Sequence, residues 1–424
     1  MFELPEKFIR RMSDIDGFEA FLKSYETPPV RAIRVNNLKI SVEDFKKISP
    51  FDLKQVPWEK TAFYVSGEGL GKTILHAAGL YYVQEPSATA VVPELEIAAG
   101  ERVLDLCAAP GGKSTQIAQY LNNKGVLVSN EIDFDRCKIL KSNIERLGVK
   151  NVAVTCCAPE KIAESFPEYF DKVLVDAPCS GEGMFKKEES AIKEWSEENI
   201  KRCSKRQSEI LSFAAQALKG GGRLVYSTCT FAKEEDEEQI ESFLSAHPEF
   251  KLIKMKKLLP HEVKGEGHFL AVMHKQNGSR AEVKLRKPKA NESMLKLYRD
   301  WESQTLNFKA DNIYCDNERV YSFLNDFPEV YGFHCDEGVY FGAKSPDGKR
   351  FEPSHRLAMC LKADEVKRIE VDEATALKYL KGLTFDCAES EKGWRVVTYM
   401  GYPLGWCKAV AGVAKNHLPK GLRI

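Results

Sequence analysis

Between residue 102 and about residue 273 the sequence alternates regularly between short apolar, β-branched runs and longer amphipathic runs. The strand-like runs are residues 102–106, 125–130, 152–155, 172–175, 222–227 and 267–273, and the helix-like runs are residues 114–121, 134–147, 199–218 and 234–245. Such an alternation predicts an α/β fold with a doubly wound, Rossmann-like and mostly parallel sheet.

Two cysteines follow strands of this predicted sheet. Asp176-Ala177-Pro178-Cys179 comes after the fourth strand, and Ser227-Thr228-Cys229 continues from the fifth. A glycine turn, Cys107-Ala108-Ala109-Pro110-Gly111-Gly112-Lys113, follows the first strand and leads into a helix. Ligands of open α/β sheets bind at the carboxyl ends of the strands. The sequence therefore places a nucleotide-type loop and two thiols at one edge of the sheet.

The glycine turn does not match a phosphate-binding P-loop. Gly112-Lys113-Ser114 and Gly71-Lys72-Thr73 both resemble the end of that motif, but it needs a glycine five positions before its Gly-Lys pair. Those positions are Cys107 and Ser66, which argues against a nucleoside triphosphatase. A tight turn into a helix, with no ligand, is the simplest alternative.

A carboxylate at the end of the second strand supports a cofactor. Glu131 lies 26 residues beyond Asp105, at about the spacing where dinucleotide folds place the acid that binds ribose hydroxyls. The sequence has no pyrophosphate-type Gly-x-Gly-x-x-Gly, which favours S-adenosylmethionine over a nicotinamide cofactor.

The paired cysteines suit one kind of chemistry. Carbon 5 of cytosine is a poor nucleophile, and a thiolate that adds to carbon 6 activates it. Asp176 could then bond the pyrimidine edge and stabilise the adduct as a general acid. Each cysteine taken alone is better explained as structural, but their joint position beside the loop reverses that preference. Cys107, Cys137, Cys203 and Cys360 lie within strand or helix patterns and are predicted to be structural.

The bulk composition sets limits without naming a partner. The 424 residues suggest two to four domains, and 62 Lys and Arg balance 62 Asp and Glu, so RNA contacts would have to come from local basic patches. The sequence shows no signal core, no membrane-length apolar stretch and no Cys-x-x-Cys spacing. We therefore expect a cytoplasmic monomer with reduced thiols, no metal and no membrane contact.

Composition shifts along the chain divide it into four predicted domains. They are a small α+β domain over residues 1–78, the sheet domain over 79–282, and two small mixed domains over 290–363 and 364–424, with a basic linker at 284–289. The expected elements outside the sheet are a helix at 8–22, strands at 32–35, 63–65, 338–342 and 394–400, and a helix at 355–361.

Several longer motifs resemble a known family. They are Pro28-Pro29-Val30-Arg31-Ala32-Ile33-Arg34-Val35-Asn36, His76-Ala77-Ala78-Gly79-Leu80-Tyr81-Tyr82-Val83-Gln84-Glu85-Pro86-Ser87, the cofactor loop, Asp176-Ala177-Pro178-Cys179-Ser180-Gly181-Glu182-Gly183-Met184-Phe185 and Tyr226-Ser227-Thr228-Cys229-Thr230-Phe231. Together they make the chain similar, over nearly its whole length, to the Sun/Nop family of RNA cytosine-5 methyltransferases, and within it to the bacterial branch that modifies small-subunit ribosomal RNA.

The resemblance implies a role for each matching residue. S-adenosylmethionine would be held by Cys107, Ala108, Ala109, Pro110, Gly111, Gly112, Lys113 and Glu131, with Arg136 and Asp176 nearby. Cys229 would be the nucleophile, and Cys179 would assist product release. The family often has an acid for the adenine amine where this chain has Cys156-Cys157-Ala158, so no adenine contact is carried over. Asp236 replaces the usual asparagine, and we interpret residues 233–238 as a solvated helix start.

The end of the chain resembles the C-terminal domains of the same branch. The matching segments are Arg350-Phe351-Glu352-Pro353-Ser354-His355, Gly401-Tyr402-Pro403-Leu404-Gly405-Trp406 and Lys415-Asn416-His417-Leu418-Pro419-Lys420-Gly421-Leu422-Arg423, which implies a PUA-like last domain that binds RNA. His355 and His417 are predicted to be satisfied structural histidines. The implied partner is 16S ribosomal RNA or the small ribosomal subunit. A transfer RNA methyltransferase and a catalytically silent RNA-binding or assembly factor remain the alternatives.

Overall fold

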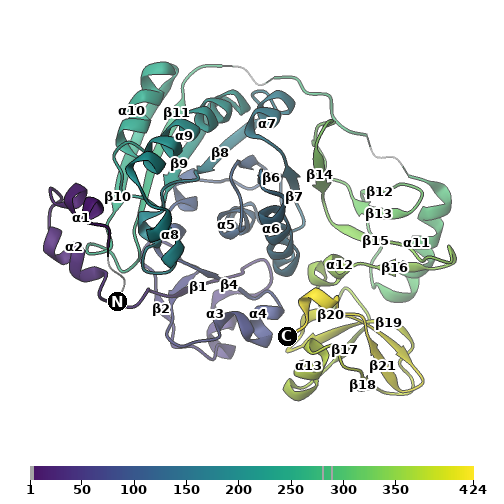
Figure 1. Cartoon of the computed structure of the whole chain (residues 1–424). Coiled ribbons are helices and arrows are strands. Elements are labelled where there is room, and N and C mark those ends of the chain that lie inside the picture. The colour runs from purple at the N-terminus through teal and green to yellow at the C-terminus, as the bar shows by residue number, and fades with distance from the viewer. Residues whose placement is uncertain (1–3, 279–280, 288–289) are drawn as a thin grey trace.

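The computed structural model describes residues 4–278, 281–287 and 290–424 (Figure 1). Met1 to Glu3 at the start of the chain, and Pro288 and Lys289 of the predicted linker, lie outside the described residues. Within the described part of the chain the strands form four sheets, of four, eight, four and five strands.

The predicted helix at residues 8–22 is two helices. α1 (Glu6–Met12) ends near Ser13, and α2 (Phe18–Ser24) begins after Gly17, whose φ of +73° breaks a continuous helix. Phe8 and Phe21 fix both helices to the central domain in one buried cluster. In Figure 1 these two purple helices lie beside the teal helix α8 (Glu189–Glu194).

A small antiparallel sheet follows, with the strand order β2-β3-β1-β4. The expected strands at 32–35 and 63–65 are present. The elements of this region are β1 (Ala32–Val35), α3 (Val42–Ile48), β2 (Lys54–Gln55), β3 (Ala62–Tyr64), η1 (Leu70–Lys72), α4 (Ile74–Ala77), β4 (Tyr81–Gln84), η2 (Ser87–Ala90) and η3 (Val92–Leu95).

The central sheet confirms the predicted α/β fold. Its order is β10-β11-β9-β8-β5-β6-β7-β14, and the pairs from β9 to β7 are parallel. Its elements are β5 (Arg102–Asp105), α5 (Gly112–Leu121), β6 (Val126–Asn130), α6 (Phe134–Leu147), β7 (Val152–Cys156), α7 (Pro159–Ser165), β8 (Phe170–Asp176), η4 (Glu182–Met184), α9 (Glu197–Ala217), β9 (Leu218–Thr228), α10 (Glu237–Ala246), β10 (Phe250–Leu258) and β11 (His268–Lys275).

Alternate residues of the parallel strands face opposite cores. Val103 and Leu174 pack with Ile117 of α5 and Leu140 of α6 on one face, and the neighbouring Leu104 packs against α7, α9 and α10 on the other. Both faces of the sheet are therefore buried, as the continuous apolar runs predict.

The two antiparallel outer strands were not expected. β10 lies at one edge, and β14 (His334–Glu337) comes from far downstream to pair with β7 at the other, with His334 opposite Cys156. Tyr169 Oη donates a hydrogen bond to the Asp326 carbonyl 2.7 Å away, close to the same junction. The later part of the chain thus completes the central sheet.

The rest of the C-terminal half holds two small sheets. α11 (Glu292–Thr305), β12 (Ile313–Cys315), β13 (Arg319–Ser322), β15 (Tyr340–Lys344), β16 (Phe351–Pro353) and α12 (His355–Cys360) form the first unit. β17 (Arg368–Glu370), α13 (Glu373–Leu380), β18 (Phe385–Asp386), β19 (Gly393–Tyr399), β20 (Tyr402–Val410), β21 (Val413–Asn416) and η5 (Lys420–Leu422) form the second. The rings of Trp301 and Trp406 meet at 5.7 Å between the two units.

The last sheet also packs against the first. Phe45 and Tyr81 of the N-terminal region share one buried cluster with Tyr379, Leu404 and Leu418. Figure 1 shows the yellow C-terminal strands next to α3 and α4. The chain therefore closes on itself, with its last strands held by its first ones.

Candidate active site

The ends of β8 and β9 bring the two predicted cysteines together. Asp176 and Ser227 are partners in the parallel pair, so the loops that follow them leave the sheet side by side. Cys179 Sγ lies 3.4 Å from Cys229 Sγ, and both side chains are partly buried. The two thiols therefore form one centre at the carboxyl edge of the sheet.

Two buried glutamates join these loops in a reciprocal manner, and we call this arrangement the glutamate latch. Glu182, after Cys179, accepts a hydrogen bond from the Phe231 amide at 2.8 Å, and Glu235, after Cys229, accepts one from the Ser180 amide at 3.0 Å. The Gly183 amide also donates to the Cys229 carbonyl at 2.8 Å. The latch fixes the backbone around both thiols.

Residues 233–238 do not form the solvated helix start that we expected from the sequence. Glu235 and Asp236 are fully buried, not solvated. Asp236 accepts a 2.6 Å hydrogen bond from Thr228 Oγ1 and pairs with Lys257 at 2.9 Å, so this acidic stretch turns inward against β9 and β10. The expectation was wrong because a run of like charges usually faces water, whereas here each buried carboxylate has a partner.

Asp176 lies at the centre of a second polar group. Lys113 Nζ contacts its Oδ2 at 2.7 Å, Ser227 Oγ donates to its Oδ1 at 2.8 Å, and His268 Nε2 lies 3.6 Å from Oδ1. Burial opposes ionisation, but the Lys113 ammonium and His268 hold the pKa of Asp176 well below its usual range. An ionised Asp176 accepts hydrogen bonds, which argues against the expected general-acid role.

The electrostatics of the two thiols differ. Hydrogen bonding to Cys229 and burial raise the pKa of Cys179 well above its usual value, so Cys179 keeps its proton. The Lys113 ammonium interacts electrostatically with Cys229. This arrangement suits Cys179 as a neutral hydrogen-bond donor towards the Cys229 sulfur.

The cofactor loop joins β5 to α5. Gly111 precedes the helix with a φ of +109°, and a Cβ there would lie 3.1 Å from Leu140 Cδ1, so a side chain would be strained in both respects. The Ala108 amide donates to the Asn130 carbonyl at 2.8 Å, and Asn143 Nδ2 donates to the Pro110 carbonyl at 2.9 Å. The loop is therefore held from β6 and α6.

Asp105, at the end of β5, has an unused acceptor. Its Oδ2 accepts a 2.6 Å hydrogen bond from Ser114 Oγ, but its buried Oδ1 has no hydrogen-bond partner among the described residues. Burial raises the pKa of Asp105 to about 7. A ligand that carries an amino group would satisfy this oxygen, so the residues present fit S-adenosylmethionine.

Glu131 and Arg136 lie where the loop after β6 begins. Glu131 is 3% exposed, its Oε1 accepts from the Asp133 amide at 3.0 Å, and its Oε2 lies 3.6 Å from Arg136 Nη1. Arg136 Nη2 also donates to the Ala109 carbonyl at 2.9 Å. The predicted ribose acid and the glycine loop are thus neighbours.

The residue in the place of the missing adenine acid has a local partner. Cys157 Sγ lies 3.3 Å from Asn130 Oδ1, and Asn130 Nδ2 donates to the Cys157 carbonyl at 3.0 Å. Burial raises the pKa of the Cys157 thiol to about 12, so it is neutral.

Cys107, in contrast to the fully helical Cys137 and Cys203, borders the loop and is partly accessible.

Sequence reasoning missed five polar residues of this centre. They are Asp105, Glu182, Ser227, Glu235 and His268. Glu182 and Ser227 lay inside the quoted motifs, and Asp105 lay near the end of the predicted strand that leads into the cofactor loop, so their position was a usable signal. His268 begins β11, a strand recognised only by its apolar content, and nothing in its immediate sequence distinguished it.

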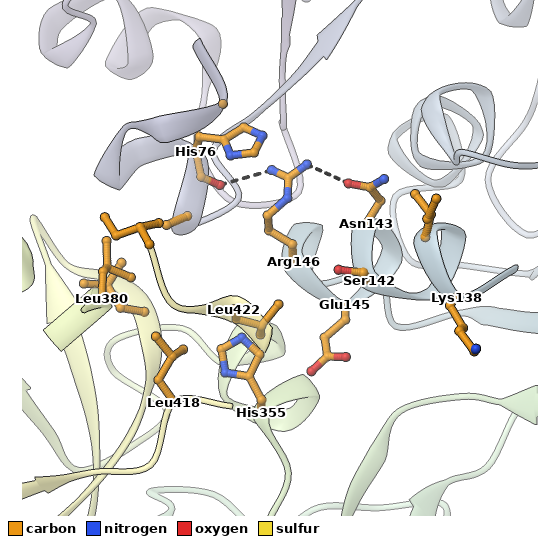
Figure 2. A pocket seen from close by; sticks show the side chains of 15 residues that line it. His76, Lys138, Ser142, Asn143, Glu145, Arg146, His355, Leu380, Leu418 and Leu422 are labelled. Atoms are coloured by element: carbon orange, nitrogen blue, oxygen red, sulfur yellow. Dashed lines mark hydrogen bonds between the residues drawn. The ribbon is translucent and has the colours of Figure 1, made fainter. Parts of the chain in front are cut away.

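A cavity of about 480 Å³ lies elsewhere, between α4, α6 and the last sheet. Figure 2 shows Arg146 at its wall, donating to the His76 carbonyl at 3.1 Å and to Asn143 Oδ1 at 3.0 Å. His355 lines the cavity too, and its buried Nδ1 has no partner among the described residues, unlike the satisfied histidine expected. The predicted site residues do not line this cavity.

Comparison with known proteins shows to which family the chain belongs. The "Ribosomal RNA small subunit methyltransferase F" of Vibrio vulnificus is 33% identical over 99% of this chain and 97% of its own length. That of Aeromonas salmonicida is 32% identical over 99% and 97%. The chain belongs to the ribosomal RNA small subunit methyltransferase F family.

Family models agree region by region with this methyltransferase F assignment. Residues 4–86 match the N-terminal domain of 16S rRNA methyltransferase RsmF, residues 92–279 match 16S rRNA methyltransferase RsmB/F, and residues 366–424 match the RsmF PUA domain. The last match confirms the expected PUA-like module.

A solved structure supports the fold of this chain. A methyltransferase homologue from Pyrococcus horikoshii is 33% identical, with a TM-score of 0.55 over 61% of this chain and 90% of its own. The described residues contain no helix long and apolar enough to cross a membrane. In the same residues no three His, Cys, Asp or Glu side chains gather as a metal site would require.

Proposed function

We propose that the protein transfers a methyl group from S-adenosylmethionine to carbon 5 of a cytosine in ribosomal RNA, through a covalent adduct with Cys229. One observation carries the proposal: Cys179 and Cys229 lie 3.4 Å apart, beside the Lys113–Asp176 pair that connects them to the cofactor loop. Membership of the methyltransferase F family supports the reaction class, and the thiol pair supports cytosine as the base.

The cofactor would lie along the carboxyl ends of β5 and β6. Glu131 would bind the ribose hydroxyls, the backbone of the loop from Cys107 to Gly112 would lie against the cofactor, and Asp105 Oδ1 would accept from the amino group. When bound, S-adenosylmethionine supplies the methyl group and leaves as S-adenosylhomocysteine. Lys113 was predicted to hold the cofactor, but its ammonium already contacts Asp176. We therefore propose that Lys113 holds Asp176 instead.

The thiolate of Cys229 would use an electron pair to form a bond to carbon 6, which makes carbon 5 nucleophilic. After methylation the carbon-5 proton leaves to solvent, the carbon–sulfur bond breaks, and the electron pair returns to the Cys229 sulfur. The Cys179 thiol would donate a hydrogen bond to that sulfur and so assist its departure. The raised pKa of Cys179 and its 3.4 Å approach to Cys229 Sγ support this role for Cys179.

Asp176 would recognise the base. As a carboxylate held by Lys113 and Ser227, it can accept a hydrogen bond from the exocyclic amine of cytosine. Uracil presents a carbonyl oxygen at that position and would be repelled. His268, whose pKa burial lowers, would remain neutral beside it.

The proposed substrate is 16S ribosomal RNA, free or within the small subunit. The names of the relatives and the PUA match support this choice over transfer RNA. We propose that a single copy suffices, because one chain supplies every residue named above. Bisulfite sequencing of total RNA from a deletion strain should show one or more 16S cytosines that lose their methyl group. A change confined to transfer RNA would contradict the substrate.

The thiol assignment is tested by two variants. Cys229→Ala should abolish methylation and form no covalent complex, because no adduct can begin. Cys179→Ala should retain attack but impair release, and should accumulate a protein–RNA adduct that survives denaturing electrophoresis and requires both the cofactor and the target cytosine.

The matched control is Cys203→Ala, since Cys203 is a buried cysteine of α9 and should be inert in this assay. An adduct from Cys229→Ala with none from Cys179→Ala would reverse the two roles. Full activity of both variants would exclude covalent catalysis by these thiols.

A further inference from the structure

The four-stranded sheet of the first C-terminal unit has one buried and one open face. Cys315, Val320 and Phe341 point into the cluster formed with α11. The strand registers place Tyr314 opposite Tyr321, and Tyr321 opposite Tyr340, so these three side chains share the other face. We call them the tyrosine strip.

The rings of the tyrosine strip are in contact. The centroids of Tyr314 and Tyr321 are 6.2 Å apart, and those of Tyr321 and Tyr340 are 5.2 Å apart, with interplanar angles of 38° and 39°. All three side chains are partly exposed. The strip is therefore a continuous aromatic surface across three strands, accessible from solvent.

Cations border the strip. The Arg286 guanidinium lies 4.3 Å from the centroid of the Tyr314 ring, and the exposed Arg319 interacts with the Tyr321 side chain. Acidic side chains are present as well. Glu337 forms an ion pair with Arg286, and the carboxylates of Glu352 and Asp316 interact electrostatically with Tyr340. Stacked arginines next to aromatic rings are a common feature of single-stranded RNA sites.

A cavity of about 310 Å³ continues the strip. Its lining includes Arg286, Lys287, Tyr314, Tyr331 and Phe333. Tyr331 is 74% exposed, and its Oη donates a 2.8 Å hydrogen bond to Glu329, which also lines the cavity. The surface thus offers aromatic rings around a hollow, with two cationic side chains and the Glu329 carboxylate at its wall.

This surface lies towards the catalytic edge of the central sheet. Tyr331 and Phe333 directly precede β14, whose first residue, His334, pairs with Cys156 at the end of β7. The carboxyl ends of β8 and β9, which carry the thiols, lie at the same edge, four to five strands away. At a strand spacing of about 4.8 Å, this is roughly 20 to 25 Å.

We propose that the tyrosine strip and the adjoining cavity bind a single-stranded stretch of the RNA substrate by base stacking, beside the segment that enters the catalytic centre. The inference rests on the proposed function only in taking RNA as the substrate. Bases stack on tyrosine rings regardless of sequence, and Arg286, Lys287 and Arg319 can contact the phosphates. In duplex RNA the bases are already stacked, so a duplex would gain little here.

The test uses the full-length chain without cofactor and two fluorescein-labelled probes, a single-stranded RNA oligonucleotide and the duplex of the same sequence. Tyr321→Leu and Tyr314→Leu should each weaken single-strand binding at least about fivefold, the fold-change for loss of about 1 kcal/mol of stacking. Duplex affinity should change less than twofold. Tyr321→Phe keeps the ring and should bind like the wild type.

Unchanged single-strand affinity in both leucine variants, with intact thermal melting, would overturn the proposal. So would an equal loss for single strand and duplex, or a loss of binding to the assembled small subunit with unchanged affinity for RNA, which would indicate a protein partner. Because the assay involves neither thiols nor methyl transfer, its failure is distinct from failure of the proposed reaction.

A second measurement does not depend on folding of the variants. Photocrosslinking of the wild-type chain to single-stranded RNA that contains 4-thiouridine should give adducts at Tyr314, Tyr321, Tyr340 or Tyr331. Adducts confined to other regions would contradict the tyrosine strip as an RNA site.

Discussion

At the scale of single residues, the centre is defined by how each polar side chain is partnered. Asp176 has three polar neighbours that favour its ionised form, whereas Asp105 has one oxygen without a hydrogen-bond partner in the described part of the chain and a pKa raised to about 7. We therefore propose different roles for these two aspartates, which lie at the ends of adjacent strands. Asp176 would accept a hydrogen bond from the cytosine base, and Asp105 would bind the amino group of the cofactor.

Glu131 gives the residue-scale prediction for the cofactor. Glu131→Ala should weaken S-adenosylmethionine binding by about 1.5 to 3 kcal/mol, the usual scale for lost hydrogen bonds to a charged group. Isothermal titration measures this directly, and RNA affinity should barely change. Asp135→Ala, at an exposed position on the same turn of the chain, is the matched control and should bind cofactor normally. An unaltered dissociation constant for Glu131→Ala would remove this residue from the site.

At the scale of elements, the glutamate latch holds the two loops that carry Cys179 and Cys229. Hydrogen bonds cross between the loops in both directions, and Ser180 Oγ and Thr230 Oγ1 meet at 2.7 Å between them. Burial raises the pKa of Glu235 to about 7, against an ordinary value of 4.5. The loop geometry is therefore maintained by a group whose ionisation the fold disfavours.

The latch predicts a pH dependence of stability. The folded state binds the Glu235 proton more tightly than the unfolded state does. The stabilisation that protonated Glu235 gives the folded state is therefore complete below about pH 4.5 and is lost as the pH rises through about 7. Glu235→Gln keeps an acceptor for Ser180 but has no charge. Relative to the wild type, it should gain on the order of 2 kcal/mol between pH 5 and pH 8.

Urea unfolding of both proteins at several pH values measures this difference. Glu189→Gln is the matched control, because Glu189 is a solvent-exposed glutamate of α8. A pH-independent difference between Glu235→Gln and the wild type would show that Glu235 does not titrate in this range.

The elements also show what sequence can and cannot predict. β5, β6, β7, β8, β9 and β11 were found because both of their faces are buried, which leaves a nearly continuous apolar run. β10 was missed because this edge strand carries Lys251, Lys254 and Lys256, a pattern typical of solvated loops. β14 was missed because three of its four residues, His334, Asp336 and Glu337, are polar, and its pairing depends on backbone hydrogen bonds that side-chain patterns do not encode.

The same limit applies to the candidate site. The cysteines, the glycine loop and Glu131 were predicted because each follows a strand directly. The burial of Glu235 and Asp236 depends on partners from distant segments, Ser180 and Lys257, and a local acidic run gives no indication of them.

At the scale of the whole molecule, the last sheet is a structural partner of the first and not a free appendage. Its core residues share one cluster with the N-terminal sheet, so removal of residues 364–424 would expose apolar surface on both sides. Point variants are therefore the better test of RNA recruitment by the PUA-like module.

Lys415 and Lys420 provide that test, because both side chains are exposed. The double variant Lys415→Ala and Lys420→Ala should lower RNA affinity and reduce the slope of log affinity against log salt by about 1.4 to 1.8, as expected for two lost phosphate contacts. Lys161→Ala, on the exposed surface of α7, is the matched control. An unchanged slope in fluorescence anisotropy titrations would argue against phosphate contacts by these lysines.

The late arrival of β14 has a consequence for the order in which the protein is made. Translation delivers β7 long before His334–Glu337, so the nascent chain must hold an unpaired sheet edge while the intervening residues are still being synthesised. Unpaired edges invite association with other chains. The central domain can thus acquire its finished border only after most of the polypeptide has left the ribosome, and a stall before Glu337 would release a methyltransferase sheet prone to aggregation.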